Sequence, residues 1–351
     1  MTENAYMGVE EIKAALDGTS GRGLDMLPVP LANEIIGRVW QESWARNMFR
    51  SYNMTSDTMD ISKLTDGMTI QGKGKTDQGA DESRGATDKI TLSLETIIGN
   101  GPIEKKLIAY SIDALMPAIE EDVVNKFAEV EEDMIINGDT ETGGSYASNI
   151  NGAYDVSNYP DGISGARDPR LLFDGLRKKA IDGAKKVNAS GQALTQTHIR
   201  KAFNQLGRHS RKKSDIIILC SLSVSYTILG WDDLRNINKY GPGATILTGE
   251  LGEIYGCKVI ATDLIPDTLG DTGVARNQGA GTDDNRSVVL VFNKTSPVIG
   301  NPAMAERKFK IALYDDIVND EIHLVPIEDI AFNVRYNEAI CYIYNVLPGT
   351  T

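Results

Sequence analysis

The chain has 351 residues, 41% of them apolar and 24% charged, so it can bury a large core and form more than one lobe. A net charge of −13 argues against a general nucleic-acid binder, whose affinity comes mainly from neutralising phosphates. No apolar run approaches the roughly 20 residues of a membrane span, and the first residues lack a signal pattern, which argues against membrane insertion and secretion. The cysteines show no paired framework and predict buried, reduced thiols in a cytoplasmic product.

Residues 1–48 predict an arm followed by a short helix. The first 25 residues are polar and rich in glycine, which is typical of a loosely held arm. Pro28 and Pro30 then favour an extended entry, because a residue that precedes proline avoids the helical region. The helix after them carries Trp40 and Trp44. Two tryptophans on so short a helix predict docking against another part of this chain or against a neighbouring chain.

Residues 49–110 predict a long β-hairpin. Met59 and Ile61 on one arm, and Ile90 and Leu92 on the other, alternate with polar residues. Between the arms, residues 71–88 contain four glycines and mixed charges but no large apolar residue. Such a tip cannot bury itself on its own domain, so it is either a disordered loop or an arm that reaches a partner. The residues by themselves leave both interpretations open.

Residues 117–138 predict a long acidic helix with one buried stripe. Apolar residues recur at spacings of four, three and four, while most of the acidic residues lie off that stripe: Val123, Phe127, Val130 and Met134 form the stripe, and Glu129, Glu131, Glu132 and Asp133 lie off it. Asn137-Gly138 supplies a C-terminal stop. A surface helix of an ordinary α/β domain fits these residues equally well. Two further amphipathic helices are predicted over residues 171–187 and 195–206.

The second half of the chain predicts an α/β lobe over residues 195–315, followed by strands. Short β-rich runs occupy residues 216–220, 258–261 and 287–292, and helix-like or turn segments separate them. Residues 309–314, 321–325 and 332–346 predict the last strands, and the final run has the composition of a buried sheet.

The search for catalytic or ligand-binding motifs identifies no site. His198, His209 and His323 have no further ligand at metal-binding spacing, and the single Asp271-Thr272-Gly273 triplet predicts a turn. Phosphate-binding and nucleophile motifs are not found. A basic cluster could contact phosphates, but a solvated loop is the favoured interpretation: Arg208, His209, Arg211, Lys212 and Lys213.

From about Leu27 to Val346, the order of elements resembles that of a tailed-bacteriophage major capsid protein of the Hong Kong 97 type. The most specific pieces are residues 251–263, with Gly252 and Gly256 before a strand, and residues 332–338. The resemblance implies an α+β fold with an N-terminal arm and helix (1–48) and an extended β-hairpin loop (49–110). It further implies a peripheral domain with a spine helix and antiparallel sheet (111–194), an apical α/β domain (195–318) and a return to the peripheral domain (319–351).

The resemblance also implies a function without an enzyme site or cofactor. Copies of the chain would assemble in the bacterial cytoplasm into hexamers and pentamers of an icosahedral virion shell around double-stranded DNA. Portal, scaffolding and decoration proteins would be further partners, and no membrane would be involved. Seven residues are candidates for non-covalent contacts between subunits: Trp40, Trp44, Lys73, Lys75, Arg84, Glu129 and Glu132. An encapsulin-type nanocompartment shell and an α/β enzyme with an unrecognised site remain as alternatives.

Overall fold

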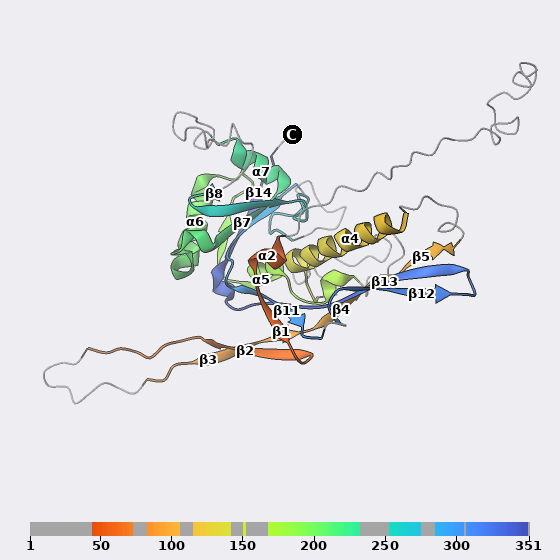
Figure 1. The fold of residues 1–351 in the computed structure, drawn as a ribbon. Coiled ribbons are helices and arrows are strands. Elements are labelled where there is room, and N and C mark those ends of the chain that lie inside the picture. The colour runs from red at the N-terminus through yellow and green to blue at the C-terminus, as the bar shows by residue number, and fades with distance from the viewer. Residues whose placement is uncertain are drawn as a thin grey trace, which may run out of the picture.

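The computed structural model describes residues 44–72, 83–105, 115–141, 150–151, 168–231, 253–274, 285–304 and 307–349. These residues form two six-stranded sheets and a separate two-stranded hairpin. In Figure 1 one sheet and its helices make a compact body, and the long strand β13 (Glu321–Val334) leads away from that body beneath helix α4 (Leu115–Asn137). Strand β13 pairs there with β12 (Lys310–Asp316). The hairpin of β2 (Thr58–Leu64) and β3 (Thr87–Ser93) extends in the direction opposite to the end of this pair.

The compact body is built on a sheet whose strand order is β6-β14-β10-β7-β9-β8. Its strands are β6 (Lys186–Asn188), β7 (Ile216–Ser221), β8 (Glu253–Ile254), β9 (Cys257–Thr262), β10 (Ser287–Asn293) and β14 (Ile340–Val346). The central strands read as continuous apolar runs because side chains on both faces are buried. Strand β10 is antiparallel to β7 and β14, whereas β7 and β9 are parallel.

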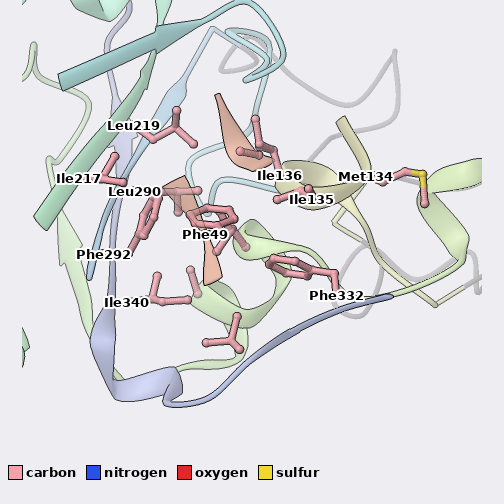
Figure 2. Close-up of a cluster of buried hydrophobic side chains, with 14 of the residues drawn as sticks. Phe49, Met134, Ile135, Ile136, Ile217, Leu219, Leu290, Phe292, Phe332 and Ile340 are labelled. Carbon is pink, nitrogen blue, oxygen red and sulfur yellow. The ribbon is translucent and has the colours of Figure 1, made fainter. Parts of the chain in front are cut away.

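Helices cover both faces of this sheet. On one face, α6 (Gln196–Leu206) and α7 (Leu222–Leu229) pack on alternate residues of the strands, such as Ile218 and Val291. On the other face, Leu219, Phe292 and their neighbours meet the end of α4, the α5 helix (Leu176–Asp182), Phe49 and Phe332. Figure 2 shows these side chains converging, with Phe49 between the strands and the end of α4. The apolar cluster on this second face of the sheet therefore joins the body to the rest of the molecule.

Strand β13 (Glu321–Val334) organises the other sheet. Four strands pair with it along its length: β4 (Glu95–Ile98), β5 (Gly101–Glu104), β11 (Pro297–Pro302) and β12 (Lys310–Asp316). The sixth strand, β1 (Arg50–Met54), pairs with β11 instead. Because β13 runs for 14 residues, its far half reaches well beyond the compact body.

The predicted hairpin is confirmed in its central part. Strand β2 (Thr58–Leu64) pairs with β3 (Thr87–Ser93) so that Met59 faces Leu92 and Ile61 faces Ile90. These four residues belong to a small cluster with residues of the β13 sheet, including Met54 and Val298. The hairpin is therefore anchored by one apolar face at its root, while its strands continue away from the body (Figure 1).

The predicted spine helix is also present, as α4 over Leu115–Asn137. Its 23 residues correspond to about 35 Å at the rise of an α-helix. Met134, Ile135 and Ile136 at its end are fully buried, whereas Val123, Phe127 and Val130 are only partly buried. Of the N-terminal elements, the described part is α2 (Ala45–Met48), and most of the predicted arm and helix lies outside the described residues.

The strand pairing differs from the predicted domain boundaries in three places. Strand β14 lies in the compact body between β6 and β10, although residues 319–351 were expected to return to the peripheral domain. Strands β11 and β12 belong to the β13 sheet, although they fall within the expected apical range of 195–318. Of the expected hairpin, 49–110, β1, β4 and β5 also belong to the β13 sheet. The reason for the first difference is that β14 is apolar on both faces, which suits a sheet covered on both sides.

Candidate inter-subunit contact surfaces

Two of the seven predicted contact residues make their contacts inside the subunit. Trp44 is only 7% exposed and packs edge-on against Phe49, with ring centroids 5.5 Å apart. Glu132 is 2% exposed, and its Oε1 accepts the backbone N–H of Trp44 and, at 3.1 Å, that of Ala45. Trp44 begins α2 without a capping side chain of its own, so a carboxylate from the spine takes that role. We therefore place both residues in the subunit core.

The other predicted contact residues are exposed or lie outside the described part of the chain. Arg84 is exposed on the hairpin beyond β3. Glu129 is partly exposed on α4, where its carboxylate lies 3.1 Å from Lys126 Nζ. Trp40, Lys73 and Lys75 lie outside the described residues. Arg84 and Glu129 thus have side chains that a second subunit could contact.

A charge cluster with two buried carboxylates joins α2, α4 and β13. Arg46 Nε lies 2.7 Å from Glu131 Oε2, and its Nη2 donates to Glu328 Oε1, while Nη1 donates to Asn301 at 3.0 Å. Both carboxylates are buried, and burial raises the pKa of Glu131 to about 7 and also raises that of Glu328. The sequence placed Glu131 off the apolar stripe of the helix but gave no sign that it is buried, because Arg46 lies 85 residues earlier.

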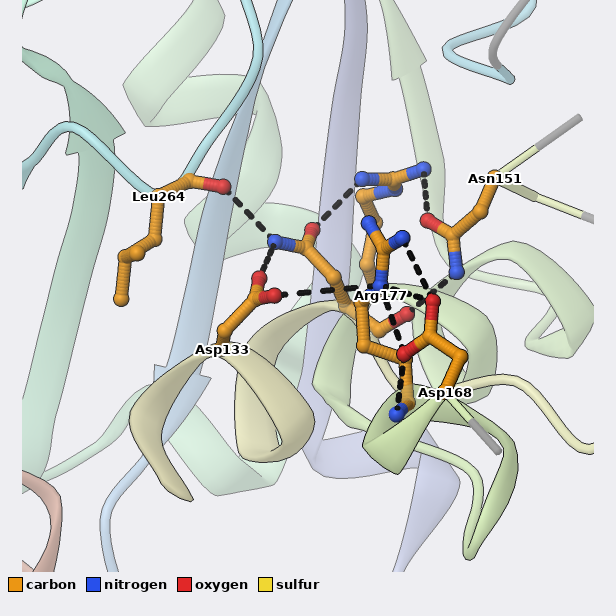
Figure 3. Close-up of polar contacts among 7 residues, drawn as sticks. Asp133, Asn151, Asp168, Arg177 and Leu264 are labelled. Carbon is orange, nitrogen blue, oxygen red and sulfur yellow. Dashed lines mark hydrogen bonds and ion pairs between the residues drawn. The ribbon is translucent and has the colours of Figure 1, made fainter. Parts of the chain in front are cut away.

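The C-terminal end of α4 is held by a second buried cluster, centred on Arg177 (Figure 3). The guanidinium donates to Asn137 Oδ1 at 2.5 Å, to the carbonyl of Ile150 at 2.5 Å and to Asn151 Oδ1 at 3.2 Å. The Asn137 amide in turn donates to Asp133 and to the carbonyl of Leu264. Burial lowers the pKa of Arg177 and raises that of Asp133. This network fixes the spine to the compact body, which gives any force on the helix a rigid support.

Large apolar side chains are exposed at the two extremities of the molecule. On the hairpin side they are Leu64, Met68 and Ile70, the last of which is 94% exposed. At the turn between β12 and β13, Ile317 and Val318 are 82% and 92% exposed. Because such residues cluster where proteins meet partners, and these two regions point away from the body in opposite directions (Figure 1), both are candidate contact surfaces.

Several features that the sequence analysis considered lie among the described residues. They contain no group of three potential metal ligands, and no helix among them is long and apolar enough to cross a membrane. Asp271 and Thr272 form a turn that ends at Gly273, whose φ is +81°, in agreement with the predicted turn. In the basic cluster, Arg208 lies 3.8 Å from Glu338 and Lys212 lies 3.0 Å from Asp215.

Comparison with known proteins identifies relatives of the chain over nearly its whole length. The model of the phage capsid family matches residues 23–343. The major capsid protein of Escherichia phage T5 is 21% identical over 187 residues, which are 53% of this chain and 35% of that protein. The chain therefore spans about a third of the length of this curated relative.

Two solved structures have the same fold. The native GTA particle capsid superposes with a TM-score of 0.63 at 12% identity, covering 94% of this chain and 99% of that one. A structure from Microbacterium phage Oxtober96 gives a TM-score of 0.59 at 15% identity, covering 95% and 99%. These likenesses confirm the predicted α+β fold of the Hong Kong 97 type. Because the family match includes both sheets, the hairpin and the spine, the chain belongs to the phage capsid family.

Proposed function

We propose that this chain is the major capsid protein of a tailed phage, a virion component that assembles into hexamers and pentamers of an icosahedral shell. The observation that carries the proposal is the hairpin, whose strands leave the body and whose outer residues, such as Ile70, are exposed on their own subunit. An apolar residue in that position gains from burial only when another molecule covers it. The role of the chain is structural, and the shell would enclose double-stranded DNA.

The geometry suits a subunit that is held at several edges. The hairpin and the β12–β13 turn provide two contact regions that point in opposite directions. Strand β13 joins them, because it pairs with β12 at one end and its Ala331 lies in the apolar cluster that anchors the hairpin. Contacts that are weak singly become strong when one subunit makes several of them simultaneously. Head-to-tail contacts of this kind close into rings when the rotation between copies permits it. Portal, scaffolding and decoration proteins would be additional partners, and a net charge of −13 suits DNA that is confined mechanically.

Shortening the hairpin tests this function. Residues 65–86 are replaced by Asn-Gly, which supports a tight turn between the paired ends Leu64 and Thr87. The shortened subunit should keep the circular dichroism spectrum and the thermal stability of the full chain, but it should form no closed shells in electron microscopy or sedimentation. A variant with Arg208→Gln and Lys212→Gln changes exposed residues elsewhere and should assemble normally.

Normal shells from the shortened subunit would contradict the proposed role of the hairpin. The contents of wild-type particles test the remaining part of the proposal. Nuclease-resistant double-stranded DNA in particles purified from the phage is the expected result, whereas an enclosed enzyme would favour the encapsulin-type alternative. A wild-type chain that remains a monomer at high concentration would contradict the shell function altogether.

A further inference from the structure

Cations gather on one part of the compact body, although the chain as a whole is acidic. From residue 183 to residue 213 the sequence contains eight lysine and arginine residues and no aspartate or glutamate, in a protein whose net charge is −13. This stretch forms β6, α6 and the turn that follows. Helix α6 lies on the face of the sheet opposite the end of α4 (Figure 1). The eight cations are Lys185, Lys186, Arg200, Lys201, Arg208, Arg211, Lys212 and Lys213.

An open groove of about 390 Å³ lies between β6 and α6. Its lining is polar and basic, and all of its side chains except that of Val187 are exposed. Lysine amines and side-chain amides are among the groups that contact phosphate oxygens in protein–DNA complexes. The groove therefore carries the donors that a phosphate requires. Its lining residues are Lys186, Val187, Asn188, Lys201, Asn204 and Gln205.

Strand β6 adds backbone donors beside the same groove. It is the end strand of its sheet and pairs with β14. The carbonyl of Lys185 accepts from β14 at 2.9 Å, and the N–H of Ala189 donates to β14 at 2.9 Å. Because successive residues of a strand direct their backbone groups to alternate sides, Lys186 and Asn188 present theirs at the free edge. Backbone N–H groups in such a position can also donate to phosphate oxygens.

The cations of this stretch differ in whether a carboxylate neutralises them. In the turn after α6, Arg208 lies 3.8 Å from Glu338, and Lys212 lies 3.0 Å from Asp215. Four other cations are exposed, and the part of the chain that the structure describes places no carboxylate within ion-pair distance of them. We call these four residues the basic surface: Lys186, Arg200, Lys201 and Arg211.

The two histidines of the stretch respond to its positive charge. Burial lowers the pKa of His198, and the neighbouring charge of Lys201 lowers it further. Burial also lowers the pKa of His209, where the effects of Arg208 and Lys185 outweigh the opposing effect of Glu338. Cations disfavour the charged imidazolium, so both shifts indicate a positive potential around α6.

We propose that the basic surface contacts the phosphate backbone of the double-stranded DNA inside the shell. The inference rests on the proposed function, which places DNA there. Helix α6 is about 16 Å long, and double-stranded DNA carries about ten phosphate charges along that distance. The remainder of the subunit is strongly negative and repels DNA, so phosphates approach most closely where cations stand without carboxylates. Phosphate contacts carry no base information, so the contact is independent of sequence.

Lysine labelling of particles tests the position. Phage particles filled with DNA, and the same particles after release of their DNA, are treated with an amine-acylating reagent and analysed by mass spectrometry. Lys186 and Lys201 should be labelled several-fold less in filled particles than in emptied ones. Lys310, exposed at the start of β12, is the control and should be labelled equally in both. Equal labelling of Lys186 and Lys201 in the two kinds of particle would overturn the proposal.

A variant with Lys186→Gln and Lys201→Gln tests the energetics. Both side chains are exposed, so the subunit should fold and close into shells normally. Its filled particles should release DNA on heating at least about tenfold faster than the wild type, because two phosphate contacts are lost. The difference should shrink as salt is raised, since salt weakens these contacts. A variant with Lys308→Gln and Lys310→Gln removes the same charge from the β12 region and should release DNA at the wild-type rate.

The remaining outcomes separate this contact from the shell function. Closed shells of the Lys186→Gln and Lys201→Gln variant that retain DNA as the wild type does would refute the contact and leave the shell function intact. Folded subunits of this variant that fail to close shells would also overturn the proposal, because the basic surface would then bind an acidic region of another copy of the chain.

Discussion

At the scale of single residues, two charge clusters hold α4 to the rest of the subunit. Around Arg177 the donors and acceptors lie within the subunit, and the guanidinium bonds to the helix end at Asn137 and to the segment at Ile150 and Asn151. Around Arg46 one guanidinium faces two carboxylates. Each cluster leaves one buried polar atom without a hydrogen-bond partner, Arg177 Nε in the first and Glu131 Oε1 in the second, and a buried carboxyl group without a donor favours its protonated form.

Replacing Arg177 by methionine should destabilise the subunit strongly. The substitution keeps the length of the apolar stem but leaves Asn137 Oδ1 and the carbonyl of Ile150 without their donor in the core. We expect the free energy of unfolding to fall by about 3–5 kcal/mol, measured by urea denaturation of unassembled protein. Arg208→Met, at an ion pair whose arginine is 75% exposed, should change it by less than about 1 kcal/mol. Equal effects of the two substitutions would contradict the structural role of Arg177.

Glu131 should make the stability of the free subunit fall with rising pH. Burial raises its pKa from an ordinary 4.5 to about 7, so the folded state holds a proton that the unfolded state has already lost between these values. The stabilisation is complete below pH 4.5 and is lost as pH rises through about 7. We expect the wild type to lose about 3 kcal/mol more than Glu131→Gln over this range. Parallel pH profiles of the two proteins would refute the assignment.

At the scale of elements, the spine ends where two backbones touch. Gly175 N donates to the carbonyl of Gly138 at 2.9 Å, and a Cβ at Gly175 would lie 2.7 Å from the carbonyl oxygens of Met134 and Ile135. The φ of Gly175 is −81°, which any residue can adopt, so close approach alone requires glycine here. The end of α4 can therefore lie directly against the start of α5.

Gly175→Ala should separate these two helices. The added methyl group must displace backbone atoms, so we expect the free energy of unfolding to fall by about 3 kcal/mol. Gly67→Ala, on the hairpin where nothing lies within 4 Å of the added atom, should have little effect. Thermal unfolding of the two unassembled variants provides the comparison. A Gly175→Ala protein as stable as the wild type would show that the contact is looser than the structure indicates.

At the scale of the whole molecule, the compact body and the projecting hairpin should differ widely in stability. Strands β7, β10 and β14 are buried on both faces, whereas β2 and β3 have many exposed residues and one apolar face at their root. Hydrogen exchange of the free subunit should be slowest in the three central strands and fast in the hairpin. Assembly into shells should then slow exchange in the hairpin. A hairpin that exchanges equally fast in both states would contradict its proposed docking.

The sequence by itself determined the fold class, the hairpin arms and the spine helix, whereas the helix predicted over residues 171–187 is in fact the short α5 followed by strand β6. The alternation at Met59, Ile61, Ile90 and Leu92 predicted both arms of the hairpin, and the observed register places these residues opposite one another. The spacing of apolar residues predicted α4 to within two residues of its observed bounds. Period-2 and period-3.6 patterns are local properties of the chain, so they can be read without knowledge of the partners.

Only the tertiary structure decided which surfaces meet. Glu132 and Trp44 were candidates for contacts between subunits, but they bind one another inside the subunit across 88 residues of sequence. Strand β14 follows β13 closely in the chain, yet it lies in the other sheet. The charge cluster of Arg46, Glu131 and Glu328 brings together three segments that are distant in the sequence. A hydrophobic pattern specifies that a face is covered but not what covers it, because the free energy of burial is non-directional and depends on the area removed from water.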